Sequence, residues 1–417
     1  MLTYLRDQSR FLRRNGRWIG GGFLLTMFSS FGQTFFIGLS GNHLRAAFDL
    51  SGGEFGGLYM VATLGSALSL PWLGRTLDIM PGWKVVRFAM PLLAVACVLI
   101  AFAPNVVVLA VSLYMLRLFG QGMMTEIAFT ETGRWFVANR GRAMSLVVIG
   151  LQAGNGVLPL VFVLVSEAAG WRSTWLSAAA LLMLAGYPLL LALLRVERVP
   201  QSHEHASKSA ARTARDWLRS QVIRDPILYL LLTGTLAPPF IGTVIFFHQG
   251  YLIALRGYDP LVFAAAFPVM AVTTVVFGLV CGHLVDRFGA LRLLPFFLAP
   301  LTVASLAVGL VTPVWGIYLF MFLLGVSNGF TQTLMGALWP EVYGLANLGA
   351  IRGITVSAMV LSTALGPGIT GALMDLGVEL PTQMVWMAGW CVLASFALAA
   401  AARKVQFREG HAAARQA

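Results

Sequence analysis

Charged residues and cysteines are scarce in this chain. Asp and Glu together number 17 among 417 residues, the four charged types make up only 11%, and there are three cysteines. Cys97, Cys281 and Cys391 all lie inside apolar runs, which favours small packing residues over a disulfide framework. So little charge in so long a chain excludes an ordinary water-soluble globule.

Charge is also missing where a membrane enzyme would need it. No carboxylate lies near the middle of a long apolar run, and no run holds a nucleophile–base pair or a cluster of metal ligands. His203 and His205 lie in a polar stretch, where a solvated linker explains them better than a metal site. We therefore expect no enzymatic activity, no metal and no cofactor.

Long apolar segments are what the chain has in abundance. Apolar residues make up 58% of the sequence, and the mean hydropathy is +0.78. A bilayer span needs about 20 such residues. We predict an all-α polytopic membrane protein with twelve transmembrane helices, at about 18–41, 54–73, 86–103, 106–127, 143–165, 173–194, 227–251, 260–281, 290–311, 314–338, 349–372 and 382–402.

The basic residues indicate how these helices are oriented. With the N-terminus in the cytoplasm, 25 of the 29 Lys and Arg residues fall on that side, and only Arg45, Arg172 and Arg256 fall on the other. This is the positive-inside pattern, and it explains the net charge of +12 without a nucleic-acid partner. We expect both termini in the cytoplasm, and the lipid bilayer as the surrounding partner.

A polar stretch divides the predicted spans into six and six. Residues 196–225 form the predicted cytoplasmic linker between an N-terminal bundle, 1–195, and a C-terminal bundle, 226–417. The halves repeat, because Gly74 and Asp78 recur as Gly282 and Asp286. Duplicated six-helix bundles are the plan of secondary transporters, which bind the solute near the membrane midplane between the two halves.

The repeated residues lie in two loops that join predicted spans. The second loop reads Gly282-His-Leu-Val-Asp286-Arg287-Phe-Gly289-Ala-Leu-Arg292. Glycine lets two helices approach closely, aspartate accepts hydrogen bonds from a helix N-terminus, and arginine pairs with carboxylates or lipid phosphates. The pattern resembles the signature loop of the major facilitator superfamily. The resemblance implies two pseudo-symmetric six-helix bundles and loops that act as gates.

One charge lies deep inside a predicted span. Arg117 is eleven residues beyond Val106, which corresponds to about 16 Å along a helix. Gln121 lies one turn further on the same face. One interpretation is a guanidinium that binds an anionic group of the solute. The other is an arginine that ties two helices together through backbone carbonyls, a role that the resemblance implies for this position.

Neutral polar residues recur inside other spans. They can bridge helices by hydrogen bonds, or they can line a cavity for a small polar anion together with Arg117. His248 is in addition a candidate proton carrier, because its unperturbed pKa is near 6.5. The candidates for solute binding are therefore Gln33, Arg117, Gln121, Gln152, Asn155, His248, Asn328 and Gln332.

Two further stretches resemble one particular group within the superfamily. The run from Arg134 to Ala143 and the run from Gly366 to Asp375 are similar to members near the monocarboxylate transporter and oxalate/formate antiporter group. The resemblance implies a bacterial inner-membrane transporter of a monocarboxylate-type anion, a proton symporter by one interpretation, that works as a monomer. An exporter of hydrophobic or cationic compounds is the alternative, because the interior is largely neutral and rich in Phe and Met.

Overall fold

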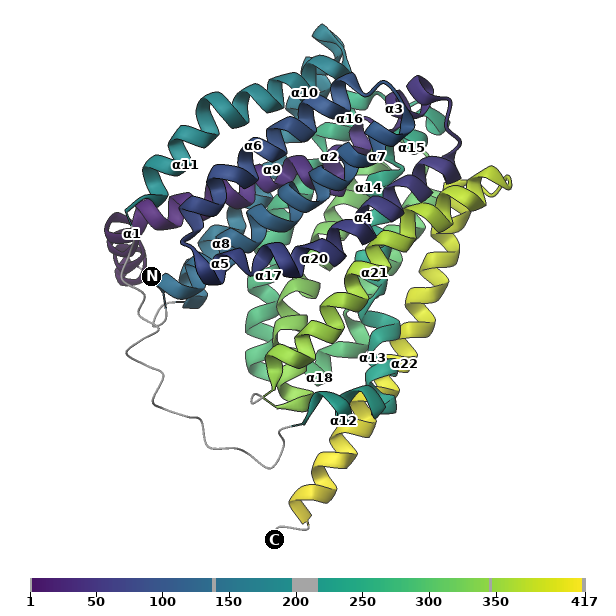
Figure 1. The fold of residues 1–417 in the computed structure, drawn as a ribbon. Helices are drawn as coiled ribbons and strands as arrows, with labels where there is room; N and C mark the ends of the chain where they lie inside the picture. The colour runs from purple at the N-terminus through teal and green to yellow at the C-terminus, as the bar shows by residue number, and fades with distance from the viewer. Residues whose placement is uncertain (1, 137–139, 197–216, 345–346, 415–417) are drawn as a thin grey trace. The chain divides into compact units, whose positions relative to one another are not determined.

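The computed structural model describes residues 2–136, 140–196, 217–344 and 347–414. These residues form helices throughout, and no strand occurs among them (Figure 1). Most of the predicted linker, with His203 and His205, lies outside the described residues. By contacts the chain divides into two compact units. Unit 1 contains residues 1–50 and 61–209, and unit 2 contains residues 51–60 and 210–417.

Eleven of the described helices or helix series are long and apolar enough to cross a membrane. The predicted span that is missing from these eleven, 54–73, coincides with α4 (Gly52–Gly74), a helix of 23 residues. Six glycines and Glu54 lower the hydropathy of α4 without shortening it.

Unit 1 begins with a helix that bends several times. The predicted span 18–41 is divided among α1 (Leu2–Ser29), the 3-10 turn η1 (Ser30–Gly32) and α2 (Thr34–Leu39), and α3 (Gly41–Phe48) follows. The remaining elements are α5 (Thr76–Ile79), α6 (Gly82–Phe102), α7 (Val106–Met115), η2 (Leu116–Met124), α8 (Thr125–Trp135), α9 (Arg140–Ala169), α10 (Trp171–Ala180), η3 (Leu181–Gly186) and α11 (Tyr187–Leu194). Both η2 and η3 are π-helices.

An aromatic core holds the first part of unit 1 in place. Phe36 packs edge-on against Phe162 and Trp175, with ring centroids 5.3 and 5.1 Å away. Trp175 also donates its indole N–H to the hydroxyl of Ser40, at 2.8 Å. These contacts fix α2 against α9 and α10 beyond the bend.

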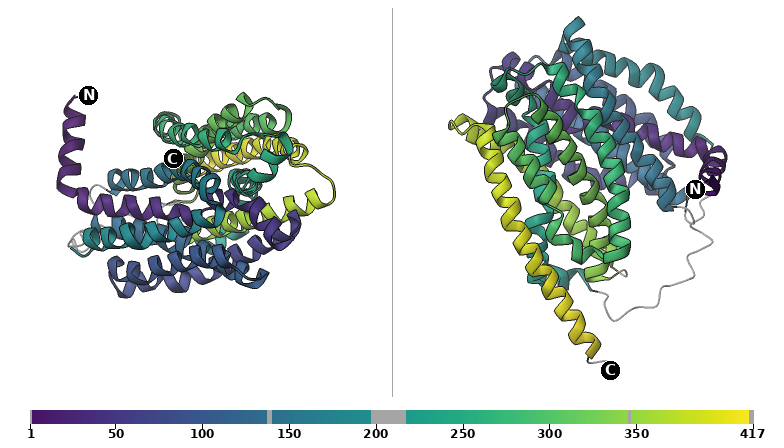
Figure 2. Two further views of the ribbon diagram at one scale, coloured as in Figure 1. Left: turned by 90° about the horizontal axis from the view of Figure 1, so that it is seen from above. Right: turned by 180° about the vertical axis from the view of Figure 1, so that it is seen from behind.

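Unit 2 has an equally interrupted first span and then longer helices. Its elements are α12 (Arg219–Arg224), α13 (Pro226–Thr235), α14 (Ala237–Phe247), α15 (Gln249–Arg256), α16 (Pro260–Ala265), α17 (Phe267–Phe288), α18 (Ala290–Leu293), η5 (Leu294–Phe296), α19 (Ala299–Leu310), α20 (Trp315–Tyr343), α21 (Leu348–Asp375) and α22 (Leu380–Ala414). Seen from behind, α22 extends well beyond the neighbouring helices toward the C-terminus (Figure 2).

Close helix contacts in unit 2 depend on glycine. A Cβ on Gly329 of α20 would lie 2.6 Å from the backbone nitrogen of Gly278 and 2.6 Å from the carbonyl oxygen of Thr274, both in α17. No side chain fits at that position, so the two helix backbones meet there directly.

Candidate solute site and gating loops

The bend in the first helix of unit 1 lies against the π-helix η2. A Cβ on Gly32 would stand 2.1 Å from the carbonyl oxygen of Leu116 and 2.7 Å from the Cα of Gly120. A Cβ on Gly120 would in turn stand 2.6 Å from the Cα of Gly32. Both positions therefore need glycine, and the crossing brings the Gly32 carbonyl to the face of η2.

Arg117 forms hydrogen bonds at this crossing. Its side chain is buried, with 5% of its surface exposed, and Nη1 donates to the Gly32 carbonyl at 3.4 Å and to the Thr34 hydroxyl at 3.3 Å. The surrounding turn is π-helical, a geometry that is frequent at functional sites. The predicted tie between helices is thus present, in the form of two long hydrogen bonds.

The other candidates of unit 1 surround the same bend. Gln33 connects η1 to α2, and the backbone nitrogen of Gln121 lies 2.6 Å from the position of a Gly32 Cβ. On the other side, a Cβ on Gly154 of α9 would lie 2.1 Å from the Ser30 hydroxyl. Asn155 beside it donates to the buried Gln152 at 3.4 Å. We call the set Gln33, Arg117, Gln121, Gln152 and Asn155 the polar junction.

The three candidates of unit 2 are not brought together in the same way. His248 is buried between α14 and α15, and its Nε2 lies 3.1 Å from the carbonyl oxygen of Pro367 in α21. Asn328 and Gln332 lie one turn apart on α20, where Asn328 is half-buried and Gln332 exposed. The described contacts do not connect His248 to either of them.

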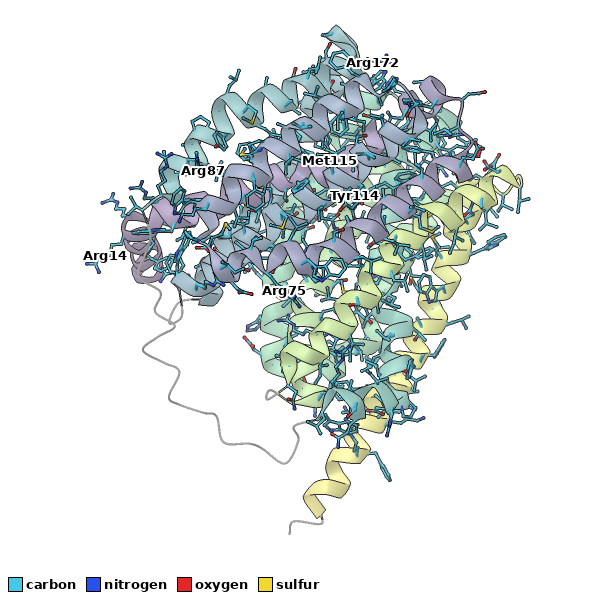
Figure 3. The ribbon with its side chains drawn as sticks, viewed as in Figure 1. Arg14, Arg75, Arg87, Tyr114, Met115 and Arg172 are labelled. Carbon is cyan, nitrogen blue, oxygen red and sulfur yellow. The ribbon has the colours of Figure 1, made fainter. Side chains whose placement is uncertain are left out.

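The sequence did not single out Thr34 or Gly32. Both are ordinary residues in an apolar run, and only the bend places a carbonyl and a hydroxyl next to Arg117. Tyr114, one turn before Arg117, was missed as well; its hydroxyl lies 2.8 Å from the hydroxyl of Ser69 in α4 (Figure 3).

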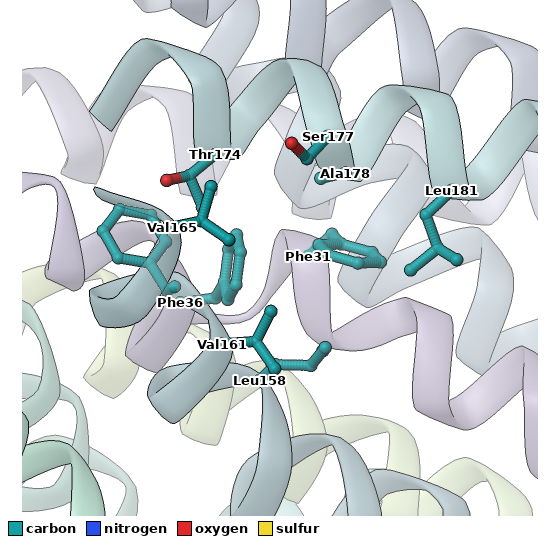
Figure 4. Close-up of a pocket in the computed structure, with 10 residues that line it drawn as sticks. Phe31, Phe36, Leu158, Val161, Val165, Thr174, Ser177, Ala178 and Leu181 are labelled. Atoms are coloured by element: carbon teal, nitrogen blue, oxygen red, sulfur yellow. The ribbon is translucent and has the colours of Figure 1, made fainter. Parts of the chain in front are cut away.

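A small apolar pocket lies next to the bend, between α9 and α10 (Figure 4). Its volume is about 70 Å³, and its lining includes Phe31, Phe36, Leu158 and Leu181. Solute sites usually measure about 300–1,000 Å³ and carry a few convergent polar groups. The pocket is therefore too small and too apolar for an organic anion.

The first predicted gating loop forms a charged cluster in unit 1. Asp78 pairs with Arg134 at 2.9 Å, and Arg134 lies 3.6 Å from Glu131. Glu131 also accepts a hydrogen bond from the backbone nitrogen of Gly82 at 3.1 Å, at the start of α6. A hollow of about 330 Å³ beside the cluster is lined by Leu70, Pro71, Gly74, Arg75, Leu77, Asp78, Glu126 and Thr130.

The second loop uses a residue that we did not predict. Glu341 of α20 accepts hydrogen bonds from the backbone nitrogens of Ala290 and Leu291, at 2.8 and 3.4 Å, and so caps α18. Gly289 before them has φ +81°, which favours glycine. Asp286, Arg287 and Arg292 are exposed, and a Cβ on Gly282 would lie 3.9 Å from the Cγ2 of Thr333 in α20. Glu341 has the same place in unit 2 that Glu131 has in unit 1. The internal repeat of the sequence could therefore have identified Glu341 as a capping residue.

A second unpredicted carboxylate caps the start of α4, within unit 2. Asp375, at the end of α21, accepts hydrogen bonds from the Ser51 hydroxyl at 2.7 Å and from the backbone nitrogens of Gly52 and Gly53 at 3.0 and 2.8 Å. Negative charge at a helix N-terminus is favourable. Glycines permit the close approach, since a Cβ on Gly371 would lie 2.3 Å from the Gly52 carbonyl oxygen.

The model of one protein family matches nearly the whole chain. The model of the Major Facilitator Superfamily covers residues 22–367 and 255–415. The chain belongs to this superfamily. Family membership confirms the predicted resemblance to the superfamily and makes the protein a membrane transporter of a small solute. The match does not show that the chain belongs to the monocarboxylate transporter group.

Three comparisons with single superfamily proteins support the fold. The probable sulfoacetate transporter SauU of Cupriavidus necator is 24% identical over 355 residues, which cover 74% of this chain and 77% of SauU. The structure of a bacterial homologue of the lysosomal transporter Spinster matches with a TM-score of 0.69 at 14% identity, over 94% of this chain and 98% of the other.

The structure of the nucleoside transporter NupG matches with a TM-score of 0.70 at 14% identity, over 92% of this chain and 98% of NupG. At these identities the solved structures establish the fold alone. They confirm the predicted all-α membrane fold of the superfamily.

Proposed function

We propose that this superfamily member moves a small organic anion, in the simplest case a monocarboxylate, by alternating access, and that Arg117 binds the anionic group. The observation that carries the proposal is the polar junction. It combines a buried guanidinium with a bent helix, a π-helix and four amide side chains within unit 1.

The energetics favour a functional arginine over a purely structural one. A charged side chain near the bilayer centre costs at least ~2.5 kcal/mol. The two Nη1 hydrogen bonds of Arg117, at 3.4 and 3.3 Å, are long. A carboxylate would accept bonds of about 2.7–2.9 Å that are roughly twice as strong as neutral ones. A bound carboxylate would add shorter bonds and an opposite charge to the two long bonds that Arg117 makes with Gly32 and Thr34.

The charge count points to a monoanion. Arg117 is the one Lys or Arg in the middle of a predicted span, so a second anionic group would meet no second guanidinium there. The similarity to SauU, which is named for sulfoacetate, supports the class of organic anions. Sulfoacetate itself is a dianion, so only one of its two anionic groups would meet Arg117. A sulfonate presents three oxygens to a guanidinium and is a further candidate for the bound group.

The remaining parts of the proposal concern coupling and orientation. His248 is the candidate to carry a proton in symport, since imidazole titrates near neutral pH. The loops around Gly74 and Asp78, and from Gly282 to Arg292, serve as gates. The distribution of Lys and Arg supports both termini in the cytoplasm. As part of the proposal, the protein lies in a bacterial inner membrane and the monomer is the working unit.

The test is uptake into proteoliposomes of labelled monocarboxylates, sulfoacetate, amino acids and sugars, with and without an inward proton gradient. We expect uptake of a monoanion by the wild type, and a loss of at least a hundredfold in Arg117→Gln. Arg117→Lys should retain a small part, because lysine keeps the charge and lacks the planar fork.

The matched control is Arg87→Gln. Arg87 is exposed on α6, also in unit 1, and the variant removes the same charge (Figure 3). Uptake that is equal in Arg117→Gln and Arg87→Gln would rule out Arg117 as the anion site. Efflux of a hydrophobic dye without uptake of any anion would instead favour the exporter.

A further inference from the structure

The short helix α12 is fastened to unit 2 at both ends. Before the helix, the backbone nitrogen of Trp217 donates to the Tyr343 carbonyl at 3.1 Å, and Asn347 donates to the Trp217 carbonyl at 2.9 Å. After the helix, the buried Asp225 caps α13 by accepting from the Ile227 nitrogen at 3.0 Å. The orientation of α12 is therefore fixed.

Arg408 of α22 completes the attachment. Its guanidinium pairs with Asp225 at 3.0 Å, donates to the Val342 carbonyl at 3.0 Å, and stacks over the ring of Trp217 at 4.5 Å. α22 thereby runs past α12 in close contact and continues beyond it toward the C-terminus, as Figure 1 shows. Removing Asp225 would leave Arg408 without its carboxylate partner.

The two helices expose a mixed basic and apolar surface. Leu218, Ile223 and Phe407 are 53%, 41% and 68% exposed. Beside them are four exposed cations: Arg219, Arg224, Arg403 and Lys404. In the part of the chain that the structure describes, none of these four forms an ion pair. We call these seven residues the α12–α22 surface.

The position of this surface along the spans places it at the edge of the bilayer. Helix α12 ends two residues before Pro226, where the next candidate span begins. On α22, Arg403 follows directly after the apolar run that ends at Ala402. Basic residues next to a span, mixed with exposed apolar side chains, are typical of contact with anionic lipid headgroups.

We propose that the α12–α22 surface binds an anionic phospholipid. The four cations bind the phosphate and headgroup, and Leu218, Ile223 and Phe407 contact the acyl chains. Charge complementarity selects this occupant, because Asp225 is already paired with Arg408 and, among the side chains that the structure describes, the four cations of this surface form no ion pair. A zwitterionic lipid would bind more weakly, since its headgroup carries no net charge. The inference does not depend on which solute is transported.

The experiment measures lipid bound to the purified full-length protein by native mass spectrometry. The probes are phosphatidylglycerol and phosphatidylcholine with identical acyl chains. We expect a clear preference for phosphatidylglycerol. Because each basic residue near the surface contributes about 1 kcal/mol, roughly fivefold, Arg219→Gln/Arg224→Gln should weaken phosphatidylglycerol binding about 30-fold.

Two further variants make the result specific. Arg403→Gln/Lys404→Gln removes the same charge from the other helix and should weaken binding to a similar extent. The matched control Lys84→Gln/Arg87→Gln removes two exposed cations from α6 and should leave binding unchanged. Thermal unfolding of each variant shows whether it is still folded. If one of the two surface variants does not fold, the other one still tests the proposal.

Three results would overturn the proposal. The first is equal binding of phosphatidylglycerol and phosphatidylcholine. The second is that both surface variants bind phosphatidylglycerol as tightly as the α6 control does. The third is displacement of the lipid by millimolar inorganic phosphate, which would identify a site for a free anion. Because the readout is lipid and not transport, failure here leaves the role of Arg117 unaffected.

Discussion

Gly32 and Gly120 meet backbone to backbone, so that a Cβ added to either would lie within 2.7 Å of the Cα of the other. This contact sets the distance between the bend after α1 and the π-helix that carries Arg117. The polar junction therefore depends on two residues that have no side chain.

Gly120→Ala should disturb the junction without changing any of its polar groups. A Cβ at 2.6 Å from the Gly32 backbone must push the helices apart, and overpacking of this kind costs about 1–3 kcal/mol. We expect a lower midpoint of thermal unfolding in detergent and weaker anion uptake. Gly20→Ala in α1 is the control, because a Cβ there meets nothing within 4 Å. Equal effects of the two substitutions would contradict this account.

Asp375→Asn should loosen the start of α4. The carboxylate accepts three hydrogen bonds from residues 51–53, and an amide offers one acceptor oxygen in place of two. We expect faster hydrogen–deuterium exchange in the segment 51–60, measured by mass spectrometry. Glu379→Gln is the control, since Glu379 is exposed after the same helix. If the exchange of this segment did not change, the cap would have no role in holding it.

Glu341→Ala should destabilise the start of α18. Loss of an N-terminal cap costs about 0.5–2 kcal/mol, and two backbone N–H groups would lose their acceptor. We expect a lower unfolding midpoint than in Glu167→Ala, which removes an exposed glutamate. Glu131→Ala should be at least as severe as Glu341→Ala, because Arg134 loses one carboxylate neighbour at the same time.

The stacking of His43 on Trp171 should weaken in acid. The rings lie 6.2 Å apart at 13°, and partial burial lowers the pKa of His43 below its usual 6.5. His43 therefore binds a proton more readily when α3 is locally unfolded than when His43 is packed on Trp171. The free energy of local unfolding of α3 consequently falls as the pH drops below 6.5. Hydrogen exchange of α3 should be faster at pH 5 than at pH 8. His43→Gln should remove this difference, and a pH dependence that persisted would point to another group.

The sequence was sufficient for the arrangement of the helices along the chain. Apolar length placed the spans, and the repeat of Gly74 and Asp78 at Gly282 and Asp286 identified the loops. The break in the first span was not predictable, because Ser30, Gly32 and Gln33 are compatible with a continuous membrane helix. The break follows from the contact with Gly120, which is distant in sequence.

The partners of charged residues were harder to predict than the charges themselves. Arg117 stood out by its depth, whereas Thr34 became relevant only through the bend. Asp286 was expected to cap a helix, and Glu341 of α20 caps α18 in its place. A helix terminus can be capped by any carboxylate within reach, and only tertiary structure decides which one that is.

The π-helix around Arg117 has a mechanical consequence. Over nine residues, Leu116–Met124, this stretch is wider and shorter than an α-helix would be. A local change from π-helical to α-helical geometry in this stretch would rotate its side chains about the helix axis. Under the proposed function, such a change of local helix geometry would let the Arg117 guanidinium move with the anion it binds while the helix stays folded.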